Sequence, residues 1–248
     1  MRREAISVSS DPAIRALRAL SQFLVAERSM GETLQRVSEI VIDALPAART
    51  AGISMLSDDG TPTTGVFTDE QAPEIDAAQY DAGRGPCLDA WRQRRVVVLN
   101  DFDQAADDYP EFVREARAHG VGSVLSLPLV AGDSGLGALN LYAPEGGTFS
   151  SRDQAVGGAL AAAAAIVLAN ASAYWEVSQL SEQLTEAMRS RAVIEQAKGM
   201  LMARSPQLSA DDAFDLLRRA SQRENVKLRD IAQRIVDRKP GSFVDDLR

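Results

Sequence analysis

The stretch from Arg189 to Asp237, RSRAVIEQAKGMLMARSPQLSADDAFDLLRRASQRENVKLRDIAQRIVD, predicts three short amphipathic helices. In each helix the apolar residues recur at steps of three and four, which places them on one stripe. The stripes contain Ile194, Ala197 and Leu201, then Ala213, Phe214, Leu217 and Ala220, then Leu228, Ile231, Ala232 and Ile235. We therefore expect a small three-helix bundle with these residues, Phe214 included, in its core.

The charge of this stretch is opposite in sign to that of the rest of the chain. Arg189 to Lys239 contains 12 basic and 7 acidic residues, a net charge of +5, and the other residues, 15 basic and 28 acidic, carry −13. A basic module on an acidic chain is typical of a segment that faces a polyanion. The alternative is a bundle whose arginines pair with neighbouring carboxylates, and charge alone leaves both interpretations open.

The chain before this stretch has the pattern of an α+β domain. Strands are expected at Thr50–Leu56, Thr61–Thr68, Arg95–Leu99, Val124–Val130 and Gly137–Tyr142. Helices are expected over Asp11–Leu45 with a turn near Gly31, from Pro86 to Trp91, over Glu111–His119, and from Ser151 onward into Met188; Gln79–Gly85 and Asn100–Tyr109 are expected to be loops. This order predicts an antiparallel-rich sheet of five or six strands with helices packed against it.

Composition narrows the class of protein. The chain has 248 residues, 45% of them hydrophobic, and a single cysteine, Cys87, so no internal disulfide can form. The longest apolar run, Val156–Ala169, is shorter than the roughly 20 residues of a membrane-spanning helix and is rich in alanine, which favours close helix packing. The N-terminal sequence lacks the apolar core of a signal peptide. We expect a cytoplasmic protein.

A heptad pattern precedes the basic module. Steps of three and four connect Val177, Leu180, Leu184, Ala187, Arg191, Ile194, Lys198 and Leu201. Such a seam predicts a coiled coil and hence a homodimer. Two cations on a dry seam would repel their partners, so the seam either ends near Arg191, or Arg191 and Lys198 reach outward from its edge.

Two segments of the first part resemble a GAF domain. They are YDAGRGPCLDAWRQRRVVVLNDF, from Tyr80 to Phe102, and VGSVLSLPLVAGDSGLGALNLYAPEGGTFSSRD, from Val121 to Asp153. The resemblance covers about Asp11 to Ser172 and implies a module that senses a small molecule or dimerises and is usually not catalytic. Because GAF-like cavities lie between the sheet and its covering loops, Tyr80, Trp91 and Leu125 are candidate lining residues of a ligand pocket.

The basic module resembles an ANTAR domain, an RNA-binding three-helix module of transcription antitermination regulators. The matching residues are Arg191, Ile194, Glu195, Gln196, Ala197, Lys198, Gly199 and Met202, then Ala213, Phe214, Leu217 and Arg218, then Asn225, Leu228, Ile231 and Ala232. The resemblance implies binding to hairpin loops in nascent transcripts. The candidate RNA-binding residues are Arg191, Gln196, Lys198, Gly199, Arg218, Asn225 and Lys227. The implied domains are residues 11–172, a connector at 173–190 and residues 191–240.

The residue types at these positions suit RNA. Arg191 and Lys198 are seven residues apart, nearly on one helix face, and can follow phosphates. Gly199 either permits close approach of a ligand to the backbone or makes a helix-packing contact. Asn225 lies at the turn into the last helix, where it can cap that helix or bond a base. With no Trp or Tyr in the module, base stacking is expected to rest on arginine planes.

Other sites with reactive side chains give no catalytic pattern. The only histidine, His119, is expected at a helix end, and no Gly-rich ATP loop follows it, which argues against a histidine kinase. Cys87 follows Pro86 at a helix start, where redox sensing and simple burial are both open; Leu88 beside it argues against bilin attachment. Asp101, Asp103, Asp107 and Asp108 lack the spacing of a calcium loop. We expect neither a metal nor a cofactor.

These observations predict a non-enzymatic regulator in which a GAF-like sensor controls RNA binding by a dimer. The input to the sensor is a small-molecule ligand, a partner or redox state. A first alternative is an adaptor whose helical tail binds a partner protein. A second is a small-molecule oxidoreductase that uses Cys87. Because a fold does not determine a function, the site itself has to distinguish these alternatives.

Overall fold

A computed structural model describes residues 11–25, 28–57, 61–68 and 72–237 of the chain. By its internal contacts the chain divides into two compact units, Met1–Trp175 and Glu176–Arg248. One long helix, α7 (Ser151–Arg204), contributes residues to both units. The three-part division expected from the sequence, with a separate connector, stays a prediction.

The described residues of the first unit form the predicted antiparallel sheet. Its strands are β1 (Thr50–Leu56), β2 (Pro62–Phe67), β3 (Val97–Leu99), β4 (Val121–Ala131) and β5 (Ser134–Pro144), in the order β2-β1-β5-β4-β3. Each neighbouring pair is antiparallel, with Ile53 opposite Leu139 and Leu125 opposite Leu141 at the centre. The α+β architecture expected from the sequence is therefore confirmed.

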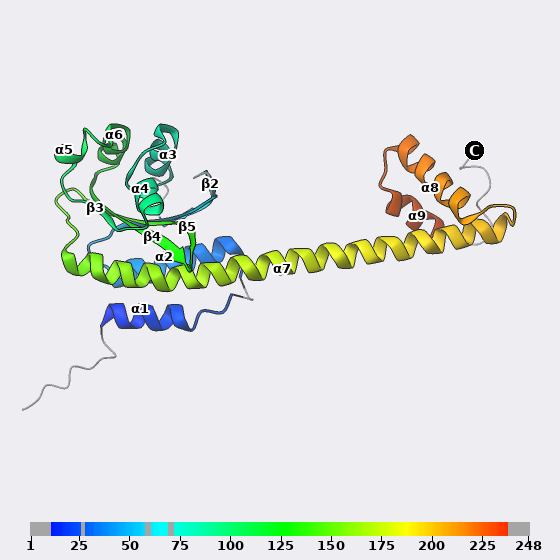
Figure 1. Cartoon of the computed structure of the whole chain (residues 1–248), viewed down its shortest axis with the longest axis horizontal. Helices are drawn as coiled ribbons and strands as arrows, with labels where there is room; N and C mark the ends of the chain where they lie inside the picture. Colours follow the sequence, from blue (N-terminus) through cyan, green and yellow to red (C-terminus); the bar gives the residue numbers. More distant parts are fainter. Residues whose placement is uncertain (1–10, 26–27, 58–60, 69–71, 238–248) are drawn as a thin grey trace, which may run out of the picture. The chain divides into compact units, whose positions relative to one another are not determined.

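Helices cover both faces of this sheet (Figure 1). On one side lie α2 (Met30–Ala44) and the first part of α7, with α1 (Pro12–Ser21) outside them. On the other side lie α3 (Ala72–Ala82), α4 (Pro86–Gln93), α5 (Phe102–Ala105) and α6 (Pro110–Ala118). Because side chains alternate along a strand, each strand supplies residues to both layers.

The layer between the sheet and α7 is a dense apolar core. Leu125, Leu127 and Leu139 are fully buried there against Ala164 and Leu168 of α7. Alanines and glycines on α7 let the helix lie close to the sheet, where a Cβ on Gly157 would come within 3.0 Å of Leu127. By length and composition α7 could cross a membrane, but 44% of its most apolar window is buried inside the structure. Packing against the sheet accounts for the alanine-rich run.

Several boundaries differ from those predicted. The first helix is not continuous: α1 ends at Ser21, and α2 begins after Ser29, whose side chain and Glu32 form a capping box. The break therefore precedes Gly31, since the capping residue and not the glycine sets it. The two predicted loops are also partly helical, because α3 extends through Gln79 to Ala82 and α5 lies within Asn100–Tyr109.

The described residues of the second unit form the predicted bundle. The last part of α7 packs with α8 (Ala210–Glu224) and α9 (Leu228–Asp237). The buried residues are Ala197, Leu201, Ala213, Leu217, Ala220, Ile231, Ala232 and Ile235. A capping box between Ser209 and Asp212 starts α8. The expectation that Phe214 belongs to this core is wrong, since Phe214 is exposed and is not among the core residues.

Candidate functional site

The last turns of α7 carry the first group of candidate RNA-binding residues. Arg191 and Gln196 are exposed, and Arg191 has no carboxylate partner among the described residues. Lys198 differs, because its side chain is only 15% exposed and its Nζ donates to both carboxylate oxygens of Glu195, at 2.9 and 3.0 Å. A phosphate could bind Lys198 only by replacing or joining Glu195.

Gly199 is next to Lys198 on the exposed surface of α7. A Cβ added to Gly199 would meet no atom within 4 Å, leaving aside its chain neighbours and the helix's own backbone. The explanation of this glycine as a helix-packing contact therefore has no support among the described residues. A glycine inside a helix costs roughly 1 kcal/mol relative to alanine. The close approach of a ligand to the backbone at Gly199 stays a prediction.

α8 and the loop after it carry the second group. Arg218 is half-exposed and pairs with Asp215 at 2.9 Å. Asn225 ends α8 in the left-handed conformation, with φ of 51°, and its side-chain amide has no partner among the described residues. Lys227 is exposed and likewise lacks a carboxylate partner in the described part of the chain. Asn225 thus closes α8 and does not cap α9.

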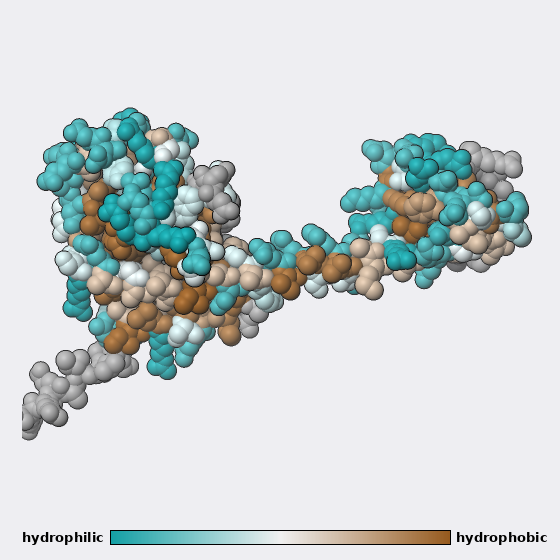
Figure 2. Space-filling model, viewed as in Figure 1, coloured by the Kyte–Doolittle hydropathy of each residue, from teal (hydrophilic) through white to brown (hydrophobic). Residues whose placement is uncertain are grey.

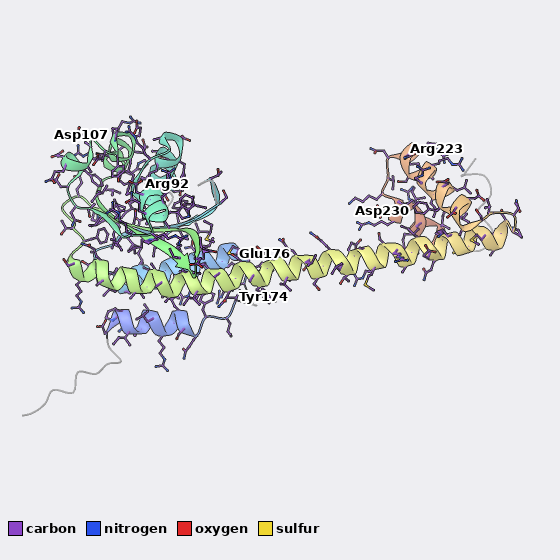
Figure 3. All side chains as sticks on the ribbon, viewed as in Figure 1. Arg92, Asp107, Tyr174, Glu176, Arg223 and Asp230 are labelled. Carbon is purple, nitrogen blue, oxygen red and sulfur yellow. The ribbon has the colours of Figure 1, made fainter. Side chains whose placement is uncertain are left out.

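Other arginines of the module are engaged in ion pairs. Arg229 pairs with Glu186 of α7 and with Asp230 at 3.4 Å (Asp230 is labelled in Figure 3), and Arg234 pairs with Glu224 at 2.7 Å. These pairs are the arrangement expected of a bundle with local charge pairing. Both sequence interpretations of the basic residues therefore apply, to different residues: some are paired and others are open to a polyanion.

An apolar stripe lies on α7 before the bundle. Val177, Leu180, Leu184 and Met188 have 57–73% of their surface exposed, and apolar groups are visible along this part of the helix (Figure 2). At about 100° per residue, this stripe is rotated by roughly 120° from the face that carries Ala197 and Leu201 into the bundle core. The stripe is thus a separate face, which pairing of α8 and α9 with α7 leaves open.

In the first unit, a buried carboxylate occupies the layer between the sheet and α3. Asp76 accepts hydrogen bonds from Tyr142 Oη at 2.5 Å, Gln79 Nε2 at 2.8 Å, Asn140 Nδ2 at 3.1 Å and Ser54 Oγ at 3.3 Å. No Lys, Arg or His is among its hydrogen-bond partners in the described residues, and its burial raises its pKa to about 6. This is an anionic site held by neutral donors alone.

Sequence reasoning missed Asp76. The available signal was polar residues at strand positions that face one side of the sheet, namely Ser54 on β1, Ser126 on β4 and Asn140 on β5. Polar side chains buried by a sheet need partners from the covering layer. Ser126 Oγ donates to Asn140 Oδ1 at 2.8 Å, so the three belong to one network with Asp76.

The predicted pocket residues do not all meet. Tyr80 Oη lies 3.6 Å from Cys87 Sγ, on the side of the sheet that faces α3 and α4. Trp91 of α4 donates from Nε1 to the carbonyl of Gly135 at 3.1 Å. Leu125 is fully buried with α7 on the opposite face. The structure therefore brings Tyr80 beside Cys87 but places Leu125 in a different layer.

The remaining reactive side chains have structural partners. Cys87 is buried, and its burial raises the pKa of the thiol to about 12, which keeps it protonated. His119 ends α6; its Nδ1 lies 3.0 Å from the carbonyl of Glu115 and its Nε2 lies 2.9 Å from Glu74 of α3. Possible metal-ligand atoms of Glu74, Glu115 and His119 lie within 4.8 Å of one another. The contacts of His119 with the two glutamates connect α3 and α6.

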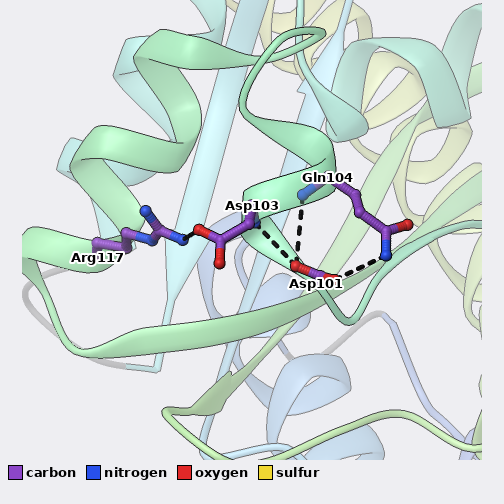
Figure 4. Close-up of polar contacts among 4 residues, drawn as sticks. All are labelled: Asp101, Asp103, Gln104 and Arg117. Atoms are coloured by element: carbon purple, nitrogen blue, oxygen red, sulfur yellow. Dashed lines mark hydrogen bonds and ion pairs between the residues drawn. The ribbon is translucent and has the colours of Figure 1, made fainter.

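The acidic segment after β3 likewise has a structural role. Asp101 caps α5 through the backbone N–H groups of Asp103 and Gln104, and Asp103 pairs with Arg117 of α6 (Figure 4). These carboxylates satisfy helix ends and a neighbouring guanidinium instead of converging on one point.

Comparisons with known proteins agree with the two units. The family model of the GAF domain matches residues 27–169, more than half of the chain, and that of the ANTAR domain matches residues 182–236. No curated protein matches the chain. Similar solved structures include fRMsr of Staphylococcus aureus in its reduced form, with 21% identity, a TM-score of 0.49, and coverage of 63% of this chain and 94% of that one.

Two further similar structures are GAF domains of phosphoenolpyruvate-protein phosphotransferases. The domain from Coxiella burnetii has 20% identity and a TM-score of 0.48, with coverage of 66% of this chain and 97% of that one. The domain from Acinetobacter has 14% identity and a TM-score of 0.46, with coverage of 67% and 96%.

The raised pKa of Asp76 predicts a pH-dependent stability of the first unit. Between the ordinary value of 3.8 and about 6, the folded protein holds a proton on Asp76 that the unfolded chain releases, so this group's contribution to stability is lost as the pH rises through that window. Asp76→Asn, which carries no charge at any pH, should therefore gain stability relative to wild type between pH 4 and pH 7.

Urea unfolding followed by tryptophan fluorescence measures this difference, because both tryptophans, Trp91 and Trp175, belong to the first unit. Asp133→Asn, at an exposed position of the β4–β5 turn, is the matched control and should run parallel to wild type. Parallel curves for Asp76→Asn and wild type would show that Asp76 does not titrate in this range.

Proposed function

Since the chain belongs to the GAF family and carries an ANTAR domain after its GAF domain, we propose that it is a signal-responsive regulator of transcription antitermination. In this role the ANTAR unit binds hairpin loops in nascent RNA, and the GAF unit controls that binding. Both domains are regulatory modules, and Cys87, the reactive group considered for an enzyme, is buried and protonated. We therefore propose that the protein is not an enzyme and that it acts in the cytoplasm.

The observation that carries this proposal is the set of open polar and cationic groups on the ANTAR unit. Arg191, Asn225 and Lys227 are exposed and lack side-chain partners among the described residues. RNA loops offer phosphates for cations and unstacked base edges for amides, so these groups match the ligand. Arg218 and Lys198 add charge if the ligand displaces Asp215 and Glu195.

Control by the GAF unit requires a group there that responds to a signal. Asp76 is the best supported candidate, because it is a buried anion without a cationic partner among the described residues. A small ligand that donates hydrogen bonds or carries positive charge would stabilise that anion and so favour a different packing of α3 on the sheet. Tyr80 of α3 and Trp91 of α4 are the residues that we propose to line the route of this ligand to Asp76.

A homodimer is the proposed state, through the apolar stripe of Val177, Leu180, Leu184 and Met188. A monomer would leave these side chains in water. Val177, Leu180 and Leu184 have the heptad spacing by which two such helices pair, and Met188 adjoins the next seam position, Ala187. The same stripe is the observation that favours the rival function, an adaptor whose tail binds a partner protein. RNA binding distinguishes the two, since an adaptor complex would survive ribonuclease.

RNA binding tests the proposal directly. A hairpin pool with randomised loops is selected on the full-length protein, and binding of the enriched hairpin is then measured for Arg191→Ala and Lys198→Gln. Glutamine keeps most of the aliphatic part of the Lys198 side chain, which is only 15% exposed. Each change should weaken binding several-fold and lower the salt dependence, because a phosphate contact releases counterions. Arg152→Ala, at an 80% exposed side chain of the first unit, should bind like wild type. Enrichment of no hairpin contradicts the proposed function.

Gly199 provides a second test, because stability and binding should move in opposite directions. Gly199→Ala removes a helix-destabilising glycine without a clash and should stabilise the ANTAR unit by about 1 kcal/mol. If RNA approaches the backbone there, the same methyl group should weaken hairpin binding. Gly158→Ala, also free of neighbours within 4 Å but in the first unit, should leave binding unchanged. Equal binding by both variants would remove Gly199 from the RNA-binding surface.

The dimer is tested at Leu184. Leu184→Glu puts a charge at the middle of the proposed seam and should shift the protein to monomer in sedimentation or light-scattering measurements. Thr185→Glu adds the same charge at the next residue, which is also exposed but lies outside the stripe, and this variant should remain dimeric. A monomeric wild type, or a dimer that tolerates Leu184→Glu, would contradict this interface.

A further inference from the structure

Phe214 is the one aromatic residue of the second unit within residues 176–237, and it lies on the surface. It is 38% exposed on α8, between the buried Ala213 and the acidic Asp215. A lone exposed apolar side chain is common on protein surfaces, so its exposure by itself indicates nothing. What distinguishes Phe214 is the chemistry of its neighbours.

The bundle gives Phe214 no place in its core. The buried positions of α8 are Ala213, Leu217 and Ala220, and the same core contains Ala197 of α7 and Ala232 of α9. These four alanines let the helices approach one another closely, and Phe214 is not among the residues of this core. Phe214 follows Ala213 by one residue, about 100° around the helix, so its ring is held at the edge of the core.

Phe214 begins a stripe of recognition groups along α8. Steps of four and three residues lead from Phe214 to Arg218 and Ser221, which places these three on one face of α8, and Asn225 follows at the C-terminal end of the helix. Arg218 is half-exposed, and the amide of Asn225 is exposed and without a partner among the described residues. The stripe thus combines a π-face, a guanidinium and a free amide, the groups that stack on, contact and read an unpaired base.

Carboxylates beside Phe214 determine which part of an RNA could meet the ring. Asp211 and Asp215 are exposed three residues before and one residue after it. They repel phosphates, so the sugar–phosphate backbone is disfavoured at this end of the stripe and favoured towards the cationic end near Lys227. A nucleobase is neutral, and its amino and imino groups can donate to carboxylates.

We propose that Phe214 is a base-stacking residue of the RNA-binding surface, on which an unpaired loop nucleobase stacks while Asn225 and Arg218 contact the adjoining nucleotides. The inference rests on the RNA binding proposed above and adds its aromatic platform, in place of the arginine planes that the sequence suggested. Stacking requires a flat π-face and does not require a particular base, so Phe214 contributes affinity, and the polar groups around it contribute selectivity.

The experiment uses the hairpin selected on the wild-type protein, with each loop purine replaced in turn by the fluorescent base 2-aminopurine. Phe214→Leu keeps an apolar side chain but removes the π-face, and Phe214→Trp keeps the π-face. Stacking predicts that Phe214→Leu binds the hairpin about tenfold more weakly than wild type and that Phe214→Trp binds it about as well as wild type. One loop position should also show 2-aminopurine fluorescence that changes on binding to wild type but not to Phe214→Leu.

The outcomes are separable. Phe214→Leu that binds the hairpin as wild type does, with the same fluorescence change, overturns the stacking role while leaving the proposed function intact. Failure of the wild type to enrich any hairpin overturns both. A Phe214→Leu variant that binds RNA normally but loses a protein partner would assign the ring to a protein contact and also overturn the inference. Equal thermal melting of the variants excludes unfolding as the cause of a loss.

Discussion

The structure depends on one helix, α7, whose apolar side chains lie in three separate regions along its length. The first part of α7 packs Ala164 and Leu168 against the sheet, and its last part supplies Ala197 and Leu201 to the bundle core. The stripe from Val177 to Met188 lies between these segments along the helix and belongs to neither core. Exposure of such a stripe to water is unfavourable, and the proposed pairing with a second copy would bury it without opening either core.

The charged groups considered in the two units differ in their burial and in their partners. Asp76 is buried and surrounded by neutral donors, so its charge is costly and its protonation state is tied to the packing of α3 on the sheet. On the ANTAR unit the charges are at the surface, where part of them are neutralised by neighbours such as Glu195 and Asp215. The proposed sensing role of the first unit rests on the first arrangement, and the proposed RNA binding rests on the second.

The sequence predicted the sheet, the bundle and the two families, because these depend on apolar periodicity and on motifs that are local in the chain. It failed where the outcome depends on which neighbour comes close. Ala213 and Phe214 are adjacent and both apolar, and the packing of the three helices buries the alanine and leaves the phenylalanine exposed. Asp76 was missed because α3 has no clear apolar stripe, and its donors on β1 and β5 come from strands far apart in the sequence. The residues proposed to bind RNA remain predictions.

RNA recognition by the ANTAR unit is the central claim, and the most direct measurement is sequencing of RNA crosslinked to the protein in its own cells. Antitermination predicts that reads accumulate in short hairpins within the leader regions of transcripts, close upstream of a terminator. It also predicts that crosslinked positions fall in the loops, because loop bases are the ones free to stack and bond. Reads spread evenly over abundant RNAs, or no crosslinked RNA above background, would contradict the account.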